Sequence, residues 1–254
     1  MITIISPAKA LDFKSEIKLE NYTSTTFQKE SVQLINKLKK LKPAEIKQLM
    51  SLSDKLAQLN FERYHDWSKE FTLKNARQAI LAFNGEVYNG LQAKTLKKDD
   101  IDYAQEKLRI LSGLHGIIKP LDLIQPYRLE MGTKLKVGKK NNLYEFWGAK
   151  LNKALSAELS THTEPVLINL ASNEYSKAAL LNKLKFKVIT IDFKELKGEE
   201  LKTITIYTKK ARGLMTRFMI TNRIDIADDL KHFDYEDYAY AENLSNDTKW
   251  VFTR

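Results

Sequence analysis

Polar side chains follow three short apolar stretches of the chain, at 2–5, 108–111 and 166–170. Together such side chains could hold an anionic substrate and move its protons. Carboxylates serve as general acids or bases, whereas lysine and arginine orient anions. Ligands of open α/β sheets bind beyond the carboxyl ends of parallel strands, so these side chains converge if the stretches are parallel neighbours. Ordinary turns and helix caps use the same residue types, which leaves a structural role open. The candidate pocket residues are Ser6, Lys9, Asp12, Arg128, Glu130, Asn169, Ser172, Glu174 and Lys177.

The segment 108–135 holds three of the chain's nine glycines and two of its five prolines. Within it, LSGLHG is similar to a helix-hairpin-helix element, in which backbone N–H groups of a glycine hairpin bind a DNA phosphate without reading the sequence. Two residues separate the glycines here, where the usual motif has one, and a plain tight turn explains them nearly as well. The candidate DNA contacts in this segment are Gly113, Leu114, His115, Gly116 and Lys119.

The stretch YTKKARGLMTRF at 207–218 is the strongest basic cluster of the chain. Its apolar residues follow the i, i+3, i+4, i+7 spacing of a helix, and its basic residues flank the apolar stripe. Such flanks can bind phosphates, or they can be a solvated rim whose aliphatic stems cover apolar surface. The candidate DNA contacts in this cluster are Lys209, Lys210, Arg212 and Arg217.

The net charge of +10 is unevenly distributed. Residues 225–248 carry eight carboxylates against one lysine, a formal charge of −7, which leaves +17 on the other residues. A basic body attracts polyanions such as nucleic acid, anionic lipid or phosphorylated ligands, although lysine can also serve solubility alone. Nucleic acid is therefore one candidate partner.

Several classes of site lack any signal. The chain has no cysteine, which excludes disulfide partners and thiolate metal sites and fits a cytoplasmic location. No histidine pair has the spacing of a metal site, and the phosphate-loop, dinucleotide and serine-elbow motifs do not occur. No apolar run approaches the length of a transmembrane helix, and the first residues lack the features of a signal peptide. We therefore expect a cytoplasmic protein with no cofactor, no bound metal and no membrane contact.

The apolar patterns predict an alternation of strands and helices. That intermixing favours an α/β class with a mixed sheet surrounded by helices. We expect one domain over 1–254, with a helical lobe at about 28–78 and the acidic segment 225–248. Strands are predicted at 2–5, 79–83, 108–111, 166–170, 186–193, 203–207 and 249–252, and helices at 28–42, 43–50, 53–65, 99–107, 143–159 and 209–223.

The chain resembles the YaaA family of bacterial peroxide stress response proteins nearly from end to end. The resemblance is weak over 180–206 and in the acidic segment, and Ala10 stands where the family usually has threonine. The matching segments are ISPAKALDF (5–13), SDKLAQLN (53–60), RYHDW (63–67), ARQAILAFNGEVYNGL (76–91), LSGLHGIIKPLDLIQPYRLEMGTKL (111–135), LYEFW (143–147), INLASNEYSK (168–177) and KKARGLMTRF (209–218).

The resemblance implies a cytosolic protein that helps cells survive hydrogen peroxide by limiting free intracellular iron. It also implies an unusual α/β fold with a helix-hairpin-helix element and a basic cleft that binds double-stranded or branched DNA, largely independently of sequence. We expect a monomer. An enzyme acting on a nucleobase or nucleotide is the alternative. In that case Glu130 or Glu174 is the acid or base, and Lys9 or Arg128 orients an anion.

Overall fold

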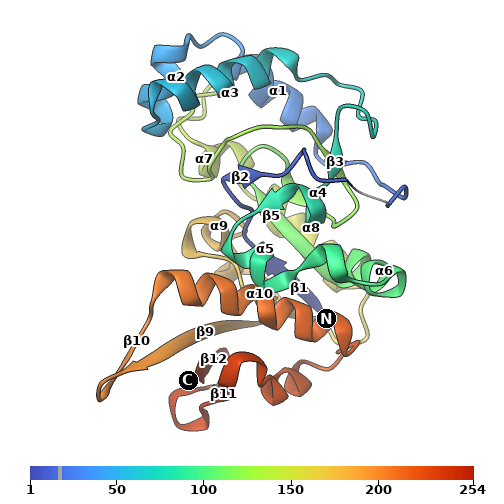
Figure 1. Cartoon of the computed structure of the whole chain (residues 1–254), viewed down its shortest axis with the longest axis vertical. Helices are drawn as coiled ribbons and strands as arrows, with labels where there is room; N and C mark the ends of the chain where they lie inside the picture. The colour runs from blue at the N-terminus through green and yellow to red at the C-terminus, as the bar shows by residue number, and fades with distance from the viewer. Residues whose placement is uncertain (17–18) are drawn as a thin grey trace.

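A mixed β-sheet forms the centre of the computed structural model, which describes residues 1–16 and 19–254 (Figure 1). The strands are β1 (Ile2–Ile5), β2 (Ala10–Leu11), β3 (Arg77–Gln78), β4 (Phe83–Asn84), β5 (Leu108–Ser112), β6 (Gly116–Ile118), β7 (Leu123–Ile124), β8 (Val166–Asn169), β9 (Lys187–Lys197), β10 (Glu200–Lys202), β11 (Ala239–Tyr240) and β12 (Lys249–Thr253). Among the described residues the sheet has eight strands, in the order β11-β12-β9-β8-β1-β5-β6, with β10 paired to β9. The predicted α/β class with a mixed sheet is confirmed.

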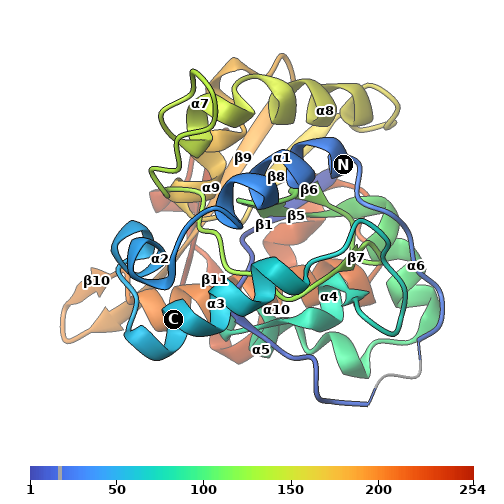
Figure 2. The same cartoon turned by 90° about the horizontal axis from the view of Figure 1, so that it is seen from above.

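Helices cover both faces of this sheet. The α-helices of the described residues are α1 (Gln28–Leu38), α2 (Pro43–Met50), α3 (Asp54–Asp66), α4 (Ala79–Ala82), α5 (Glu86–Leu91), α6 (Lys98–Lys107), α7 (Leu143–Trp147), α8 (Lys150–Leu159), α9 (Asn173–Ala178) and α10 (Thr205–Thr221). Figure 2 shows the sheet between α8 on one side and α5, α6 and α10 on the other. The helices α1, α2 and α3 lie together at one end of the molecule (Figure 1). Pro43 begins α2, and the Ser53 side chain caps α3 by accepting from the Leu56 N–H, so both helices begin within a residue of the predicted positions.

The central strands are parallel, and this brings the predicted site to one edge. β1 lies between β5 and β8, and Ile4 pairs with Arg109 on one side and Asn169 on the other. All four residues of β1 are buried, as expected of a parallel strand covered on both faces. The segments that follow β1 and β8 therefore start at the same edge of the sheet, which confirms the predicted convergence for two of the three stretches. The segment after β5 instead turns back into β6.

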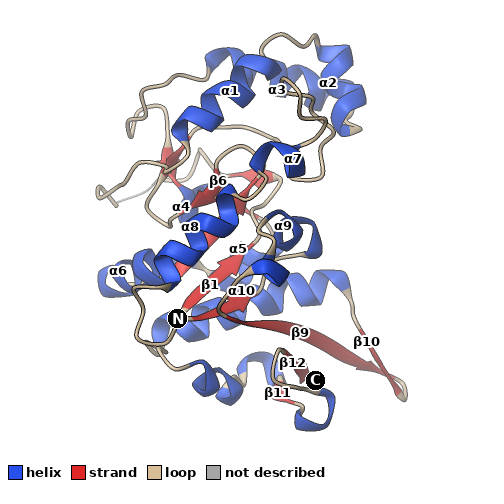
Figure 3. Ribbon diagram, turned by 180° about the vertical axis from the view of Figure 1, so that it is seen from behind, coloured by secondary structure: helices blue, strands red, loops and turns tan. Residues whose placement is uncertain are grey.

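Three predicted elements are wrong or incomplete. Residues 79–83 form the short helix α4 and the start of β4, because a buried apolar run cannot distinguish a helix from a strand by its period. Residues 203–207 are not a strand, since β9 and β10 form a projecting hairpin and α10 begins at Thr205 (Figure 3). The helix predicted at 143–159 is divided into α7 and α8 at Gly148, whose φ is 49°.

The predicted helix-hairpin-helix element is also wrong. LSGLHG is the turn of a β-hairpin, in which β5 and β6 pair antiparallel with Ser112 opposite Gly116. A Cβ at Gly113 would lie 2.3 Å from the Leu129 carbonyl oxygen, so this glycine permits close packing of two backbones. Leu114 and His115 are fully buried. A DNA phosphate cannot reach this hairpin, because side chains and backbone surround it.

His115 is part of the core beneath that hairpin. Its Nδ1 atom lies 3.0 Å from the Ser31 hydroxyl, and its ring packs edge-on against Tyr127. Burial lowers the pKa of His115 to about 3, so the ring is neutral at ordinary pH. The residue therefore serves the fold and not a charged ligand.

Candidate functional site

A pocket of about 650 Å³ opens at the carboxyl ends of β1 and β8, and we name it the strand-end pocket. Six of the predicted pocket residues line it, together with two residues predicted as DNA contacts. Its volume is in the range that holds a small ligand. The charged and hydroxyl residues of its lining are Ser6, Lys9, Glu86, Tyr88, Tyr127, Arg128, Glu130, Ser172, Glu174, Tyr175, Lys209 and Arg212.

Glu130 is held between two cations at the mouth of this pocket. Its carboxylate lies 2.7 Å from the Lys9 ammonium and 2.9 Å from the Arg128 guanidinium. Burial by itself would raise the pKa of Glu130, but the hydrogen bonds from Lys9 and Arg128 outweigh burial and hold the pKa below its usual value. The carboxylate is thus ionised at neutral pH, and it neutralises part of the positive charge around it. Tyr64 donates to the Arg128 carbonyl and fixes this segment against α3.

The ends of β1 and β8 are fastened to each other across the pocket floor. The Ser172 N–H donates to the Ser6 hydroxyl at 2.9 Å, and the Tyr88 hydroxyl donates to the Ser6 carbonyl at 3.1 Å. Glu174 accepts from the Gly132 N–H at 2.9 Å. These bonds position the loops. The hydrogen bond from Gly132 uses one oxygen of the Glu174 carboxylate. The floor is therefore preformed.

Arg212 enters the pocket from α10, and a glycine pair determines how close that helix comes. A Cβ at Gly213 would lie 1.8 Å from the Val87 carbonyl oxygen, and one at Gly90 would lie 2.2 Å from the Lys210 carbonyl oxygen. The helices α5 and α10 can therefore cross in backbone contact. Lys209 also lines the pocket, one helical turn before Arg212.

The remaining basic residues predicted as DNA contacts lie outside the pocket, and Lys210 and Arg217 have partners there. Lys210 forms an ion pair with Glu236 of the acidic segment. Arg217 donates to the carbonyls of Leu91 and Gln92 at the end of α5, at 3.0 and 3.2 Å. Lys119 lines a separate hollow with Arg109 and Glu158. These side chains stabilise the fold or lie apart from the pocket.

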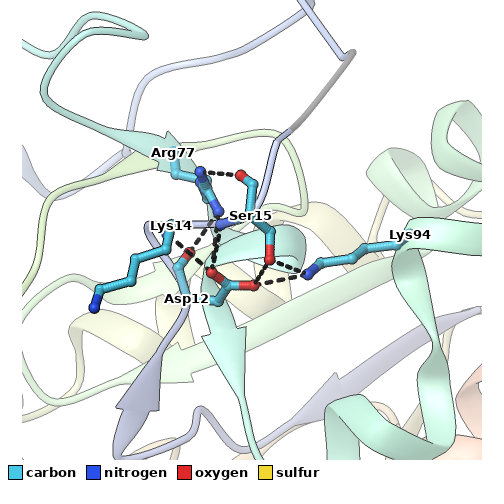
Figure 4. A network of polar contacts seen from close by, with 5 residues as sticks. All are labelled: Asp12, Lys14, Ser15, Arg77 and Lys94. Atoms are coloured by element: carbon cyan, nitrogen blue, oxygen red, sulfur yellow. Dashed lines mark hydrogen bonds and ion pairs between the residues drawn. The ribbon is translucent and has the colours of Figure 1, made fainter.

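Asp12 is the clearest predicted pocket residue that the structure places elsewhere. It accepts from the backbone N–H groups of Lys14 and Ser15, each at 3.0 Å, and lies 2.7 Å from the Lys94 ammonium and 3.5 Å from Arg77 (Figure 4). The Lys94 and Ser15 hydrogen bonds hold the pKa of Asp12 well below its usual range. The carboxylate is satisfied by its own neighbours, so this cluster is structural.

Asn169 and Lys177 also do not line the strand-end pocket. The Asn169 amide donates to the Thr190 hydroxyl at 3.3 Å and its carbonyl accepts from the Ala171 N–H, so it ties β8 to β9. The Lys177 ammonium lies 5.0 Å from the centroid of the Tyr144 ring. Both predictions of a pocket role are therefore corrected. On α9, Glu174 lines the pocket, whereas Lys177, one turn later, does not.

A second hollow of about 620 Å³ adjoins the pocket, and we name it the lysine groove. It lies between the α1–α2 region and the segment 132–136, and its cationic lining is Lys37, Lys134 and Lys136, against one carboxylate, Glu45. The Gly132–Glu174 hydrogen bond joins the two hollows, because Gly132 lines the groove and Glu174 lines the pocket.

Sequence reasoning missed the tyrosines of the pocket. Tyr88, Tyr127 and Tyr175 are buried and line it, and burial raises the pKa of each of them. Tyr127 also exchanges a hydrogen bond with Ser112 at 2.6 Å. Tyr88 belongs to the motif AFNGEVYNGL, in which Asn84 and Gly85 indicate a turn. That turn was the one feature of the motif that could have suggested a site. Nothing in the spacing links that motif to the ends of β1 and β8.

Two negative findings apply to the described residues, 1–16 and 19–254. No group of three or more histidine or acidic side chains there could hold a metal ion. No helix in that part of the chain has both the length and the apolar character needed to cross a membrane. The absence of a bound metal or cofactor stays a prediction.

The mixed sheet and the charged hollow at its parallel strand ends define an α/β protein with a preformed strand-end pocket. The chain belongs to the family described as peroxide stress protein YaaA, whose family model matches residues 1–244. It is 51% identical to a UPF0246 protein of Dechloromonas aromatica and 50% identical to one of Ralstonia nicotianae. Both alignments cover 100% of this chain and 99% of the relative.

Proposed function

We propose that this peroxide stress protein binds DNA, duplex or branched, through the cleft made by the strand-end pocket and the lysine groove. The observation that carries the proposal is the charge of the two hollows, which together have seven lysine and arginine side chains and four carboxylates. Lys134 and Lys136 are exposed, and no ion pair is found for them among the described residues. Free cations along a groove suit phosphate contacts that ignore sequence.

The resemblance to the family adds the biological setting of the proposal. Binding would protect DNA during peroxide stress, and free intracellular iron would be limited without a metal held by this chain. The LSGLHG hairpin has no part in the proposal because it is buried. The DNA contacts move instead to the cleft, where Lys209 and Arg212 of the earlier set remain.

A salt series of fluorescence anisotropy measurements tests the proposal. The logarithm of the affinity should fall linearly with the logarithm of the salt concentration, and Lys134→Gln with Lys136→Gln should reduce that slope by about 0.9 per lost phosphate contact. Lys98→Gln is the matched control, since Lys98 is exposed on α6 and lines neither hollow. Equal slopes for the double variant and the control would contradict DNA binding in the groove.

An enzyme acting on a nucleobase or nucleotide is the second candidate. Two carboxylates inside a small pocket favour it, because Glu130 and Glu174 would repel the phosphates of DNA, whereas an acid–base reaction needs such groups. Glu130→Gln and Glu174→Gln should then abolish the rescue of peroxide-treated cells and leave the melting temperature unchanged. A lower melting temperature together with lost rescue would assign Glu130 to its ion pairs with Lys9 and Arg128, and Glu174 to its hydrogen bond with Gly132. Intact rescue in both variants would favour DNA binding alone.

A further inference from the structure

Arg212 carries a charge that the fold leaves without a partner. Among the described residues, its guanidinium makes no ion pair and no hydrogen bond, and its Nε atom is buried. Burial lowers the pKa of Arg212, with the more distant Asp192 opposing that effect. Asp192 itself is paired with Lys249 at 2.9 Å. Arg212 is partly buried, and its Nε atom is enclosed without a partner. A cation that is partly desolvated and unpaired destabilises a fold, so it indicates an anion that binds from outside.

Arg212 differs from the other cations of α10, because two of them have partners and Lys209, which also lines the pocket, is exposed to water. Lys210 and Arg217, on the same helix, are satisfied by Glu236 and by the end of α5. Arg212 follows the buried Ala211 and precedes Gly213, whose backbone lies against Val87. The helix crossing thus fixes Arg212 at the pocket and prevents α10 from moving it into solvent.

A second guanidinium in the pocket is only partly satisfied. Arg128 donates from Nη2 to Glu130, but its Nε atom is buried and has no hydrogen-bond partner in the described part of the chain. Its side chain is 16% exposed, so water reaches little of it. Two arginines with unused donors in one hollow suit a multidentate oxyanion, since the planar guanidinium matches phosphate geometry.

We propose that Arg212, supported by Arg128, binds the phosphate of a nucleoside monophosphate in the strand-end pocket. Three tyrosines, Tyr88, Tyr127 and Tyr175, supply the aromatic wall for the nucleoside part, and a volume of about 650 Å³ accommodates it. The proposal deepens the proposed function, on which it rests only for the class of ligand. A free mononucleotide and one nucleotide turned out of a DNA strand present the same base to this site, the first with a terminal phosphate and the second with a phosphodiester.

Isothermal titration calorimetry tests the proposal with deoxynucleoside 5′-monophosphates and, separately, with inorganic phosphate. The intact protein should bind a monophosphate at least tenfold more tightly than Arg212→Gln does, and Arg212→Lys should be intermediate because it keeps the charge and loses the fork. Lys98→Gln should bind like the unchanged protein. Thermal melts without ligand must show that Arg212→Gln is folded.

Three results would count against the nucleotide site or against part of it. Equal affinity of the unchanged protein and folded Arg212→Gln, or no heat at millimolar monophosphate, would overturn the proposal. Inorganic phosphate binding as tightly as the monophosphates would overturn the nucleoside part of it. DNA anisotropy in parallel separates the two claims: DNA binding without monophosphate binding leaves the proposed function standing alone, and the reverse result contradicts the groove and supports Arg212.

Discussion

The LSGLHG hairpin and the KKARG segment of α10 both combine glycine with basic or polar residues, yet the structure uses them differently. Glycine permits backbone contact in both, through Gly113 against Leu129 and Gly213 against Val87. The hairpin keeps a neutral His115 in the core, whereas α10 leaves the charged Arg212 at a hollow. At these two places glycine therefore marks close packing, and the unpaired charge of Arg212 is where we propose that a ligand binds.

The largest expected effect comes from adding a methyl group at either close contact. Gly213→Ala and Gly113→Ala should each lower the free energy of unfolding by about 3 kcal/mol or more, because the new Cβ would overlap a carbonyl oxygen. Urea denaturation measures this. The control is Gly138→Ala, where the Cβ meets nothing within 4 Å and only the φ of 58° is strained. It should cost about 1 kcal/mol. Similar losses at all three positions would remove packing as the common cause.

The second largest effect should come from acid, which should destabilise the protein through the buried His115 of the hairpin. The pKa of His115 is lowered by burial from 6.5 to about 3, so between these values the unfolded chain binds the extra proton. The stability from the neutral ring is complete above pH 6.5 and is lost as the pH falls toward 3. At pH 4 the loss is about 3 kcal/mol, at 1.36 kcal/mol for each pH unit.

Melting curves from pH 7 to 4 give the test, with His115→Gln as the comparison. The variant should show a shallower decline in stability, although the carboxylates, including Asp12 with its lowered pKa, still contribute below about pH 5. If both proteins decline in parallel above pH 5, His115 is not a buried neutral group.

Replacing Arg212 should raise the stability of the protein, in contrast to the substitutions above. Arg212→Met keeps the aliphatic stem and removes an unpaired charge, so the ligand-free protein should gain about 1 kcal/mol of stability. Ligand-binding residues often lower the stability of a fold in this way. Guanidinium denaturation would show a loss instead if Arg212 supports the fold.

Much of the fold follows from local patterns. The apolar runs at 2–5 and 166–169 are buried parallel strands, and Pro43 and Ser53 mark helix starts. The same reasoning placed Ser6, Lys9 and Glu174 at one edge, because parallel neighbours end together.

The rest depends on tertiary contacts that no local pattern encodes. Residues 79–83 and 108–118 are both apolar, yet the first forms a turn of helix and the second a hairpin. Asp12 lies only three residues after Lys9, but Lys94 and Arg77, from distant parts of the chain, draw it into its own cluster. The pairing of Lys210 and the isolation of Arg212 likewise depend on where the acidic segment and α5 fold.

The most direct test of the account compares the cleft with the hairpin as DNA-binding surfaces. Anisotropy over a salt series should be measured for Lys209→Gln with Arg212→Gln and for His115→Gln, all at pH 7, where His115 is neutral. We expect the double variant to reduce the salt slope by about 1 to 2 and to bind all sequences more weakly to the same degree, because two phosphate contacts are lost. The His115 variant should bind as the unchanged protein does. Weaker binding by His115→Gln, with unchanged binding by the double variant, would contradict the central claim.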